Sequence, residues 1–335
     1  MKTLEEIKQI EKLSIKNFKS IKDLEIDCKR VNLFIGEPNA GKSNILEALG
    51  LISWCSYGGE LKKYVRFHGI QNLFFDNLLD RSVDIKIIKQ NGKNKISLDS
   101  GINISFQDDA FVFKTKKKSP VFKLDYNGNS DKLPDIPEFA YVKFFRYSKM
   151  EQFPDIRSSF LMPPHGSNLY AVVMANKKLR DIMTGFFKNY GFNLISKPQE
   201  KTFDILKQTA DMVFSYPYIL ASDTLQNIIF HVMAIESNKN STLIFEEPES
   251  HAFPYYTKYL GEKIAFDESN QYFIATHNPY LLKAIIEKTS IDSINVFITY
   301  FKDYQTRVKC LSQEEMSELL EYDPFFNLNS FIEEE

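Results

Sequence analysis

Apolar and polar residues alternate with a period of two in the first part of the chain. Residues 12–18 and 24–28 alternate around a polar turn, which predicts two short antiparallel strands. The mainly apolar residues 31–35 predict a buried strand, and helical spacing begins near Lys42 after a loop that contains two glycines. The pattern therefore predicts two paired strands followed by a strand, a loop and a helix.

The middle of the chain predicts a different kind of structure. Short apolar runs between residues 82 and 126 are separated by turns such as Asn-Gly, which is typical of a β-meander. Pro134 and Pro137 mark a connector before a strand at residues 141–146. Residues 167–190 have helical spacing without proline and predict one or two helices on an inserted lobe. Heptads long enough for a coiled-coil arm are missing.

Composition narrows the class of protein only a little. The chain has 335 residues, enough for one large domain or two closely packed ones. Its formal net charge of -2 gives no global electrostatic reason to expect binding to nucleic acid or an acidic membrane. Cys28, Cys55 and Cys310 are too widely separated to indicate a disulfide framework or a zinc site. The charged N-terminus and the lack of a long apolar run lead us to expect a cytoplasmic protein without a membrane partner.

The most specific motif is the loop after the third predicted strand, which reads Gly36-Glu37-Pro38-Asn39-Ala40-Gly41-Lys42-Ser43. This spacing lets backbone N–H groups surround a triphosphate, sends Lys42 to the β- and γ-phosphates and places the Ser43 hydroxyl on Mg²⁺. The alternative, a glycine turn with a surface lysine, does not require the strand and helix on either side. We expect ATP to contact Gly36, Asn39, Ala40, Gly41, Lys42, Ser43 and Asn44.

Two later strands end in residues that suit nucleotide hydrolysis. Glu246 and Glu247 follow an apolar strand whose alternation points them in different directions, so Glu246 can hold the metal while Glu247 polarises a water. Taken alone, the pair fits the start of a turn equally well. Another apolar strand ends at His277. Because strand ends converge on the ligand crevice of open α/β sheets, we expect all three side chains and the loop at one rim.

A helix N-terminus lies between the loop and the acidic strand in the sequence. Ser222 or Asp223 suits the N-cap of the amphipathic run at residues 227–236, and a capped helix N-terminus is another anion site. About two hundred residues separate Lys42 from Glu246, far more than one crossover helix needs. Additional lobes are therefore expected between them.

Together these motifs resemble the ABC-type ATPase heads of the RecF, SMC and OLD group, in its stand-alone AAA-like branch. The resemblance covers nearly the whole chain and rests on Ile15-Lys16-Asn17-Phe18-Lys19-Ser20, the loop at residues 36–43, Phe245-Glu246-Glu247-Pro248-Glu249, Thr276-His277-Asn278-Pro279 and Gly166-Ser167-Asn168-Leu169. It implies an α/β P-loop NTPase of the ABC-ATPase type, with a mainly parallel core sheet flanked by helices, an antiparallel β-subdomain and an inserted helical lobe.

The resemblance also implies how the chain is divided. We expect a single head over residues 1–335. Its parts are the N-terminal strands, phosphate loop and first helix (1–80), the β-meander (81–130), the inserted helical lobe (150–210), and the signature, acidic strand, switch histidine and C-terminal strands (211–335).

ATP hydrolysis by a homodimer that sandwiches two ATP molecules is the activity that the resemblance implies. Lys42 would bind the β- and γ-phosphates, Ser43 and Glu246 would organise Mg²⁺, and Glu247 would be the base. His277 would sense the γ-phosphate, and Ser222 would complete the other copy's site in trans.

The chain departs from the family pattern in two places. The family signature usually has glycine near its serine, whereas Ser222-Asp223-Thr224-Leu225 has none, so a side chain crowds the approach to the γ-phosphate. The first acidic residue, Glu246, stands where Asp is commoner, and a water-mediated metal contact would absorb the extra methylene.

Three further candidates have open alternatives. The family resemblance implies a metal-binding glutamine after the first helix, and Gln71 is the best candidate by position. The alternative is that Gln71 is an ordinary loop residue. Lys19 either approaches the phosphates or stays solvated. The basic run at residues 114–119 either contacts nucleic-acid phosphates or forms a solvated hairpin tip.

Three functions compete at this point. The first is an ATPase switch that licenses a separate effector, for example a nuclease, in DNA repair or phage defence, with the effector docked on residues 150–210. The second is a slowly hydrolysing, nucleotide-gated scaffold. The third is a P-loop small-molecule kinase, which fits least because a carboxylate beside an acidic strand with a later histidine suits attack by water.

Overall fold

The computed structural model describes residues 9–91, 96–115, 120–157, 159–250, 252–321, 325 and 328–332. Residues 116–119 of the basic run lie outside the described residues. None of the helices in the described ranges is both long and apolar enough to cross a membrane.

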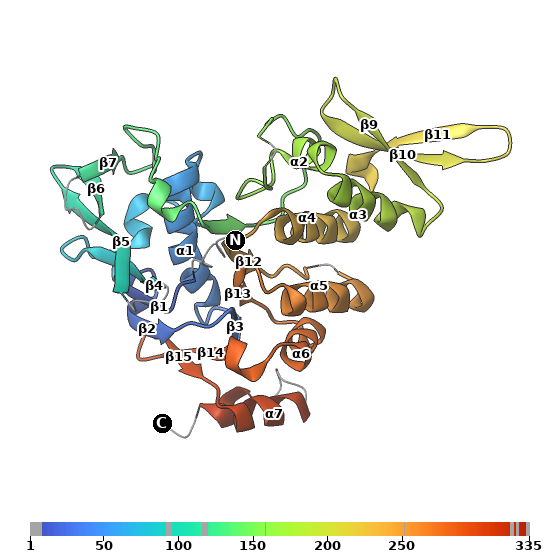
Figure 1. The fold of residues 1–335 in the computed structure, drawn as a ribbon. Helices are drawn as coiled ribbons and strands as arrows, with labels where there is room; N and C mark the ends of the chain where they lie inside the picture. Colours follow the sequence, from blue (N-terminus) through green and yellow to red (C-terminus); the bar gives the residue numbers. More distant parts are fainter. Residues whose placement is uncertain are drawn as a thin grey trace.

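A six-stranded sheet forms the centre of the molecule (Figure 1). Its strands, in the order β15-β14-β3-β13-β12-β8, are β15 (Gln305–Cys310), β14 (Ile294–Lys302), β3 (Val31–Ile35), β13 (Gln271–Ala275), β12 (Thr242–Glu246) and β8 (Val142–Phe145). All neighbours pair in parallel except β14 and β15. The predicted, mainly parallel core sheet is confirmed, and its parallel strands all end at the same edge.

Helices cover both faces of this core sheet because its strands are apolar on both sides. The helix α1 (Lys42–Tyr57) covers one face, and α4 (Asp223–Ser237), α5 (Pro254–Phe266) and α6 (Pro279–Lys288) cover the other (Figure 1). Alternation along β3 sends Phe34 into the core around α1 and sends Leu33 and Ile35 into the core around the other helices. Near the C-terminus, α7 (Gln313–Glu321) follows β15.

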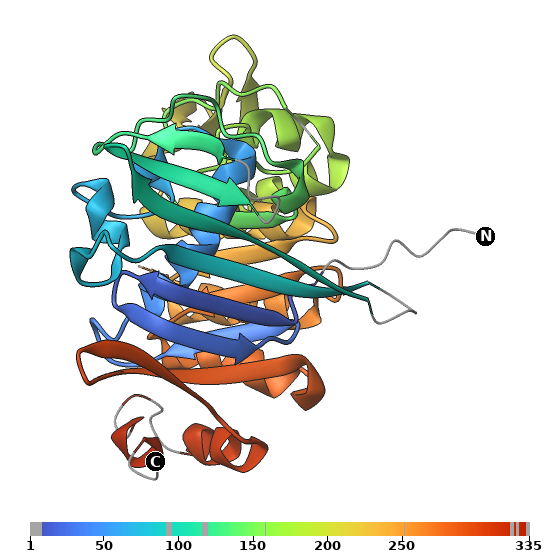
Figure 2. The same ribbon diagram turned by 90° about the vertical axis from the view of Figure 1, so that its left-hand side faces the viewer.

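A second, antiparallel sheet packs over α1 (Figure 2). Its strands, in the order β2-β1-β4-β5-β6-β7, are β2 (Ile21–Asp27), β1 (Lys12–Phe18), β4 (Val83–Asn91), β5 (Ile96–Gln107), β6 (Ala110–Thr115) and β7 (Pro120–Leu124). The predicted meander and the two predicted N-terminal strands are therefore confirmed. They form one sheet rather than two pieces, because β1 pairs with β4 as well as with β2.

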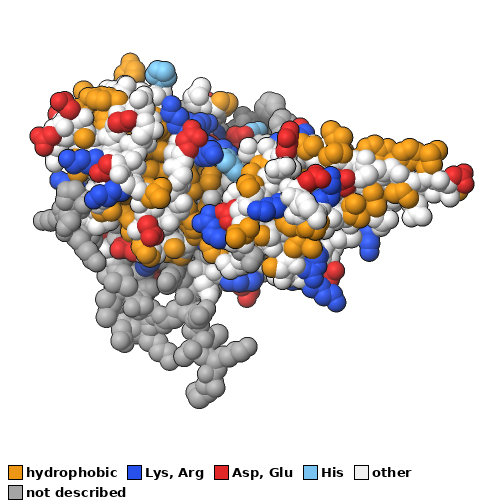
Figure 3. All heavy atoms as spheres, turned by 90° about the horizontal axis from the view of Figure 1, so that it is seen from above, with side chains coloured by type: hydrophobic (Ala, Val, Ile, Leu, Met, Phe, Trp, Pro, Cys, Tyr) orange, Lys and Arg blue, Asp and Glu red, His pale blue; other side chains and the backbone are white. Residues whose placement is uncertain are grey.

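The inserted lobe differs from the prediction. It begins with α2 (Leu169–Ala175) and α3 (Lys177–Lys188), which confirms the two expected helices. Three antiparallel strands follow, however: β9 (Asn193–Lys197), β10 (Thr202–Gln208) and β11 (Val213–Pro217). A purely helical lobe was wrong, because alternating residues such as Phe203 and Ile205 pack as a strand against the helices. The projecting end of this sheet carries exposed hydrophobic side chains (Figure 3).

Short 3-10 helices link the larger elements. They are Leu61–Lys63, Ile70–Leu73, Phe75–Asn77, Pro137–Phe139, Tyr218–Leu220, Ile291–Ser293 and Leu328–Phe331.

Candidate nucleotide-binding site

The loop between β3 and α1 is tightly packed against the edge of the core sheet. Gly36 and Gly41 have φ values of 146° and 101°, which favour glycine. A Cβ on Gly36 would lie 2.1 Å from the carbonyl oxygen of Thr299, and one on Gly41 would lie 2.0 Å from the hydroxyl oxygen of Thr306. Neither position accepts a side chain, so the path of the loop depends on both glycines.

Lys42 is the first residue of α1, and its side chain folds back over the loop. Its Nζ donates to the carbonyl oxygens of Gly36 at 2.6 Å and Glu37 at 2.9 Å. Burial lowers the pKa of Lys42, while Glu247 and Glu37 act in the opposite direction. The ammonium group therefore lies inside the loop, at the N-terminal end of the helix dipole, rather than in solvent.

Hydrogen bonds to Ser20 connect the segment that follows the loop to the turn between β1 and β2. Asn44 Nδ2 donates to Ser20 Oγ at 2.7 Å, and Ser20 Oγ lies 2.6 Å from Thr306 Oγ1. Gly36, Asn39 and Ala40 line a cavity of about 570 Å³ at the end of β14. Asn44 thus anchors the loop to the turn between β1 and β2, which is a contact that the sequence did not predict.

Ser43 and Glu246 meet in a second cavity of about 350 Å³, which Glu247 also lines. The Ser43 side chain hydrogen-bonds to the Glu246 carboxylate. Burial acts to raise the pKa of Glu246, but Arg146, the Ser43 hydroxyl and Arg66 outweigh it, and the pKa lies below its usual value. Glu246 is therefore held as a carboxylate beside a hydroxyl.

Glu246 belongs to a group of five charged side chains, which we call the charge network: Lys19, Glu47, Arg66, Arg146 and Glu246. Arg146 Nε and Nη2 lie 3.0 Å and 2.6 Å from Glu246 Oε2, and Arg66 Nη2 lies 3.1 Å from Glu246 Oε1. Arg66 Nε also bonds to Glu47 Oε1 at 2.6 Å, and Lys19 Nζ bonds to Glu47 Oε2. The Glu47 side chain has no exposed surface.

The sequence analysis did not predict the charge network. Lys19 is not solvated: its side chain is 12% exposed and pairs with the fully buried Glu47. Arg146 ends the strand predicted at residues 141–146, but nothing in the local pattern showed that this strand lies beside the acidic one. No local sequence pattern indicates that Arg66 or Glu47 belongs to the site.

Glu247 and His277 form a second, more open arrangement. His277 Nδ1 lies 3.1 Å from Glu247 Oε1, and their side chains are 61% and 40% exposed. Glu247 has a φ of 46°, and its N–H donates to the carbonyl oxygen of Ala275 at 2.9 Å. This left-handed turn at the end of β12 directs Glu247 away from the charge network and towards His277. The structure thus brings together the two residues that the sequence predicted as base and γ-phosphate sensor.

Glu249 is a buried carboxyl that the sequence analysis noted only as part of the acidic motif. Its residue is 3% exposed, and Thr276 Oγ1 donates to its Oε1 at 2.5 Å. Its Oε2 has no hydrogen-bond partner among the described residues. Burial raises the pKa of Glu249 to about 7, although the Thr276 hydrogen bond acts in the opposite direction.

Ser222, one of the two N-cap candidates in the sequence, is the N-cap of α4, and its Oγ accepts a hydrogen bond from the N–H of Leu225 at 3.2 Å. It does not line the cavity of Ser43 and Glu246, although Asp223 and Asn227 of the same helix do. Ser222 instead lines a largely apolar groove of about 410 Å³ beside β10 and β11. Its predicted role on the nucleotide of a second copy stays a prediction.

Gln71 lies in the 3-10 helix Ile70–Leu73, outside the residues that line the cavity of Ser43 and Glu246. Its Oε1 is buried and has no hydrogen-bond partner among the described residues. The structure therefore does not bring Gln71 together with the other predicted metal ligands. Two arginines, Arg66 and Arg146, are among the side chains that line the cavity.

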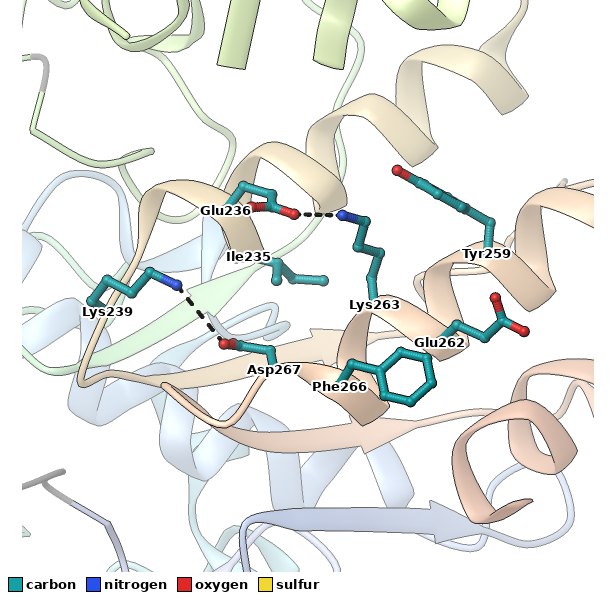
Figure 4. Close-up of a pocket in the computed structure, with 8 residues that line it drawn as sticks. All are labelled: Ile235, Glu236, Lys239, Tyr259, Glu262, Lys263, Phe266 and Asp267. Atoms are coloured by element: carbon teal, nitrogen blue, oxygen red, sulfur yellow. Dashed lines mark hydrogen bonds and ion pairs between the residues drawn. The ribbon is translucent and has the colours of Figure 1, made fainter. Parts of the chain in front are cut away.

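A further cavity of about 330 Å³ lies between α4 and α5, away from the carboxyl ends of the parallel strands (Figure 4). Its charged side chains pair with one another: Lys263 Nζ lies 2.6 Å from Glu236 Oε1, and Lys239 Nζ lies 3.9 Å from Asp267 Oδ1. Lys239 precedes β12, and Asp267 precedes β13. This cavity is therefore at the opposite edge of the sheet from the loop.

The residues at the rim fit a magnesium nucleotide. Ser43 and Glu246 offer a hydroxyl and a carboxylate oxygen, which are the donors that Mg²⁺ prefers. The loop places Lys42 and the start of α1 where phosphates bind in P-loop proteins. Such a rim, at the end of a parallel sheet with helices on both faces, defines a P-loop ATPase of the ABC type.

Comparisons with known proteins agree with this class. A family model described as "AAA ATPase domain" matches residues 9–227. The chain belongs to this family. It is an ATPase, and it is an ABC-type ATPase head of the RecF and SMC group.

Three curated relatives show how far the similarity extends. DNA replication and repair protein RecF of Clostridium kluyveri is 30% identical over 264 residues, which cover 69% of this chain and 68% of that protein. An ATP/GTP phosphatase of Helicobacter pylori is 22% identical, with 91% of this chain and 93% of that protein covered. MJECL10 of Methanocaldococcus jannaschii is 30% identical over 122 residues, but only 33% of this chain and 56% of that protein are covered.

Among solved structures, the SMC head bound to the C-winged helix domain of ScpA is similar in fold. It matches with a TM-score of 0.60 and 17% sequence identity, covering 91% of this chain and 99% of that one. The predicted fold class is thereby confirmed.

Proposed function

We propose that this ATPase is a switch: two copies close around two molecules of Mg²⁺-ATP and open again after hydrolysis. The observation that carries the proposal is the meeting of Ser43, Glu246, Glu247 and His277 at one rim. Lys42 binds the β- and γ-phosphates, and Ser43 and Glu246 hold the metal. Glu247 is the base that activates water, and His277 orients it and responds to the γ-phosphate.

The second copy supplies the part that one copy lacks. Ser222 caps α4 beside the cavity but does not line it, which supports a role towards the nucleotide of the partner copy. Asp223 follows it and pairs with Lys149 at 2.7 Å, so charged side chains lie near the serine, where the family signature usually has glycine. We propose that this makes the closed dimer dependent on ATP rather than permanent.

We further propose that the closed dimer licenses a separate effector protein in DNA repair or phage defence. Relatives support this by their names: RecF proteins are named for DNA replication and repair, and an SMC head carries a bound ScpA domain. Exposed apolar side chains within residues 150–210, among them Ile156, Tyr190 and Ile195, support that lobe as the docking region.

Light scattering tests the dimer directly. Glu247→Gln should retain ATP without hydrolysing it, so its mass should double when Mg²⁺-ATP is added. Glu247→Gln combined with Lys42→Ala is the matched control, which should stay at the mass of one copy because it cannot bind the phosphates. A Glu247→Gln protein that binds ATP without any gain in mass would contradict the switch and favour a nucleotide-gated scaffold.

A further inference from the structure

Arg146 stands next to Glu246 because of the register of the core sheet. Phe145 at the end of β8 pairs with Phe245 of β12, so the next residues, Arg146 and Glu246, leave adjacent strands side by side. Arg146 makes two contacts to Glu246 Oε2, and Arg66 makes one to Glu246 Oε1. Both oxygens of the predicted metal ligand are thus already engaged by guanidinium groups.

The charge network has a surplus of positive charge. Lys19, Arg66 and Arg146 are three cations around two carboxylates, Glu47 and Glu246. A dication on Glu246 would stand within a few ångströms of two guanidinium groups in a partly buried place, where repulsion is weakly screened. Metal binding therefore requires at least one guanidinium to leave Glu246 for another anion.

Three other carboxylates lie near Arg146: Glu47, and Glu247 and Asp223 in the same cavity, of which Asp223 pairs with Lys149. Glu47 Oε1 already accepts from Arg66 at 2.6 Å and lies 3.4 Å from Arg146 Nη2. The cavity that Arg146 lines also contains Ser43 and Glu247, the residues that face the phosphates and the water in the proposed function. A phosphate oxygen in that cavity is a suitable acceptor, because a guanidinium group binds phosphate in a planar, two-pronged way.

Resting on the proposed function, we propose that Arg146 is the nucleotide-sensing residue of this chain. Its guanidinium group alternates between two partners: the Glu246 carboxylate and the terminal phosphate of bound Mg²⁺-ATP. The metal thus replaces the arginine on Glu246. Only a nucleotide with a γ-phosphate offers Arg146 its second partner.

The backbone around Arg146 connects this exchange to the rest of the molecule. The Arg146 N–H donates to the carbonyl oxygen of Pro164 at 3.0 Å, and its carbonyl oxygen lies 2.7 Å from His165 Nδ1. These contacts tie it to the turn that leads to α2. Three residues further on, Lys149 pairs with Asp223 at the first position of α4. A change of partner by Arg146 is therefore transmitted along the chain to Lys149, and through its ion pair with Asp223 to the N-terminus of α4, where Ser222 lies.

Nucleotide binding without turnover tests the proposal. In a Glu247→Gln background, calorimetry measures the affinity for ATP and for ADP, each with Mg²⁺, after adding Arg146→Gln, Arg146→Lys or Arg157→Gln. Arg157 is the matched control, since it forms an ion pair with Asp155 away from the cavity. We expect Arg146→Gln to weaken ATP binding at least tenfold and ADP binding less than threefold. Arg146→Lys should lose less ATP affinity than Arg146→Gln. Arg157→Gln should bind both nucleotides as tightly as the Glu247→Gln background does.

Metal binding provides a second readout that does not depend on turnover. Mn²⁺, followed by electron paramagnetic resonance, serves as the probe for Glu246 in protein without nucleotide. Arg146→Gln should bind Mn²⁺ at least threefold more tightly than the background, because a guanidinium group no longer competes for Glu246.

The outcomes separate this inference from the proposed function. If Arg146→Gln and Arg146→Lys weaken ATP and ADP equally, or weaken neither, Arg146 does not sense the γ-phosphate and the inference fails while the ATP site stands. If the background protein binds neither nucleotide, the proposed function fails and the inference fails with it. Preserved ADP affinity in Arg146→Gln shows that the variant is folded.

Discussion

Glu246 and Glu247 are adjacent in the sequence but lie in two contrasting regions. The Glu246 side chain is 11% exposed and sits in the charge network between two arginines. The Glu247 side chain is 40% exposed and lies 3.1 Å from His277 Nδ1, and it is close enough to Lys42 to act on that ammonium group electrostatically. The end of β12 separates them, because the backbone turns into the left-handed region at Glu247. Two residues of one type are thus given different chemistry by their surroundings.

The contrast indicates a division of labour. A carboxylate fixed by several cations keeps its charge and position, which suits a metal ligand. A half-exposed carboxylate beside a histidine is free to take up a proton from water and pass it on, which suits a general base. The predictions below test the two regions against each other.

The largest effect is expected from Glu247→Gln. Loss of a positioned general base typically costs a factor of about 10² to 10⁴ in rate, so ATP turnover should fall by roughly that factor. ATP affinity, measured by calorimetry, should change little because the charge network and the loop are untouched. Glu262→Gln, at a partly exposed carboxylate on α5 that pairs with Lys258, is the control. Normal turnover in Glu247→Gln would show that Glu247 is not the general base.

A smaller effect, on stability rather than rate, is expected from Glu47→Gln. Removing one partner from a buried ionic group costs about 3 kcal/mol, because Lys19, Arg66 and Arg146 then share one carboxylate. Denaturation by urea measures the change. Glu25→Gln, which removes a surface ion pair to Lys12, should cost less than about 1 kcal/mol. Equal losses in the two variants would mean that the charge network adds no stability.

The smallest effect concerns pH and Glu249. Burial raises the pKa of Glu249 from 4.5 to about 7 in the folded chain, so the folded chain binds more protons than the unfolded chain between these values. The stabilisation is complete below about pH 4.5 and is lost as the pH rises to about 7, by roughly 3 kcal/mol at most. Glu249→Gln removes this titration.

Melting curves at pH 5 and pH 8 compare the two proteins. The wild type should lose more stability between these pH values than Glu249→Gln does. Glu25→Gln, at a surface carboxylate whose side chain is 57% exposed, serves as the control and should follow the wild type. The same pH dependence in Glu249→Gln and in the wild type would show that Glu249 is not the titrating group.

The sequence by itself determined the parts of the site that are local. The loop at residues 36–43, Glu246 and Glu247 after their strand, His277 after the next, and the N-cap at Ser222 were all predicted from neighbours within a few residues. This works because a phosphate loop and a strand end need particular residues at fixed spacing. The β-meander was predicted for the same reason, since its periodicity lies within single segments, whereas the parallel core sheet was predicted only through the family resemblance.

Only the tertiary structure decided what surrounds these residues. Arg146 reaches Glu246 because β8 and β12 are neighbours in the core sheet, although 100 residues separate them in the chain. The three-stranded sheet of the inserted lobe and the position of Gln71 outside the cavity were likewise not predictable. Ion pairs between distant residues depend on strand order and packing, and these follow from the burial of the whole chain rather than from any local pattern.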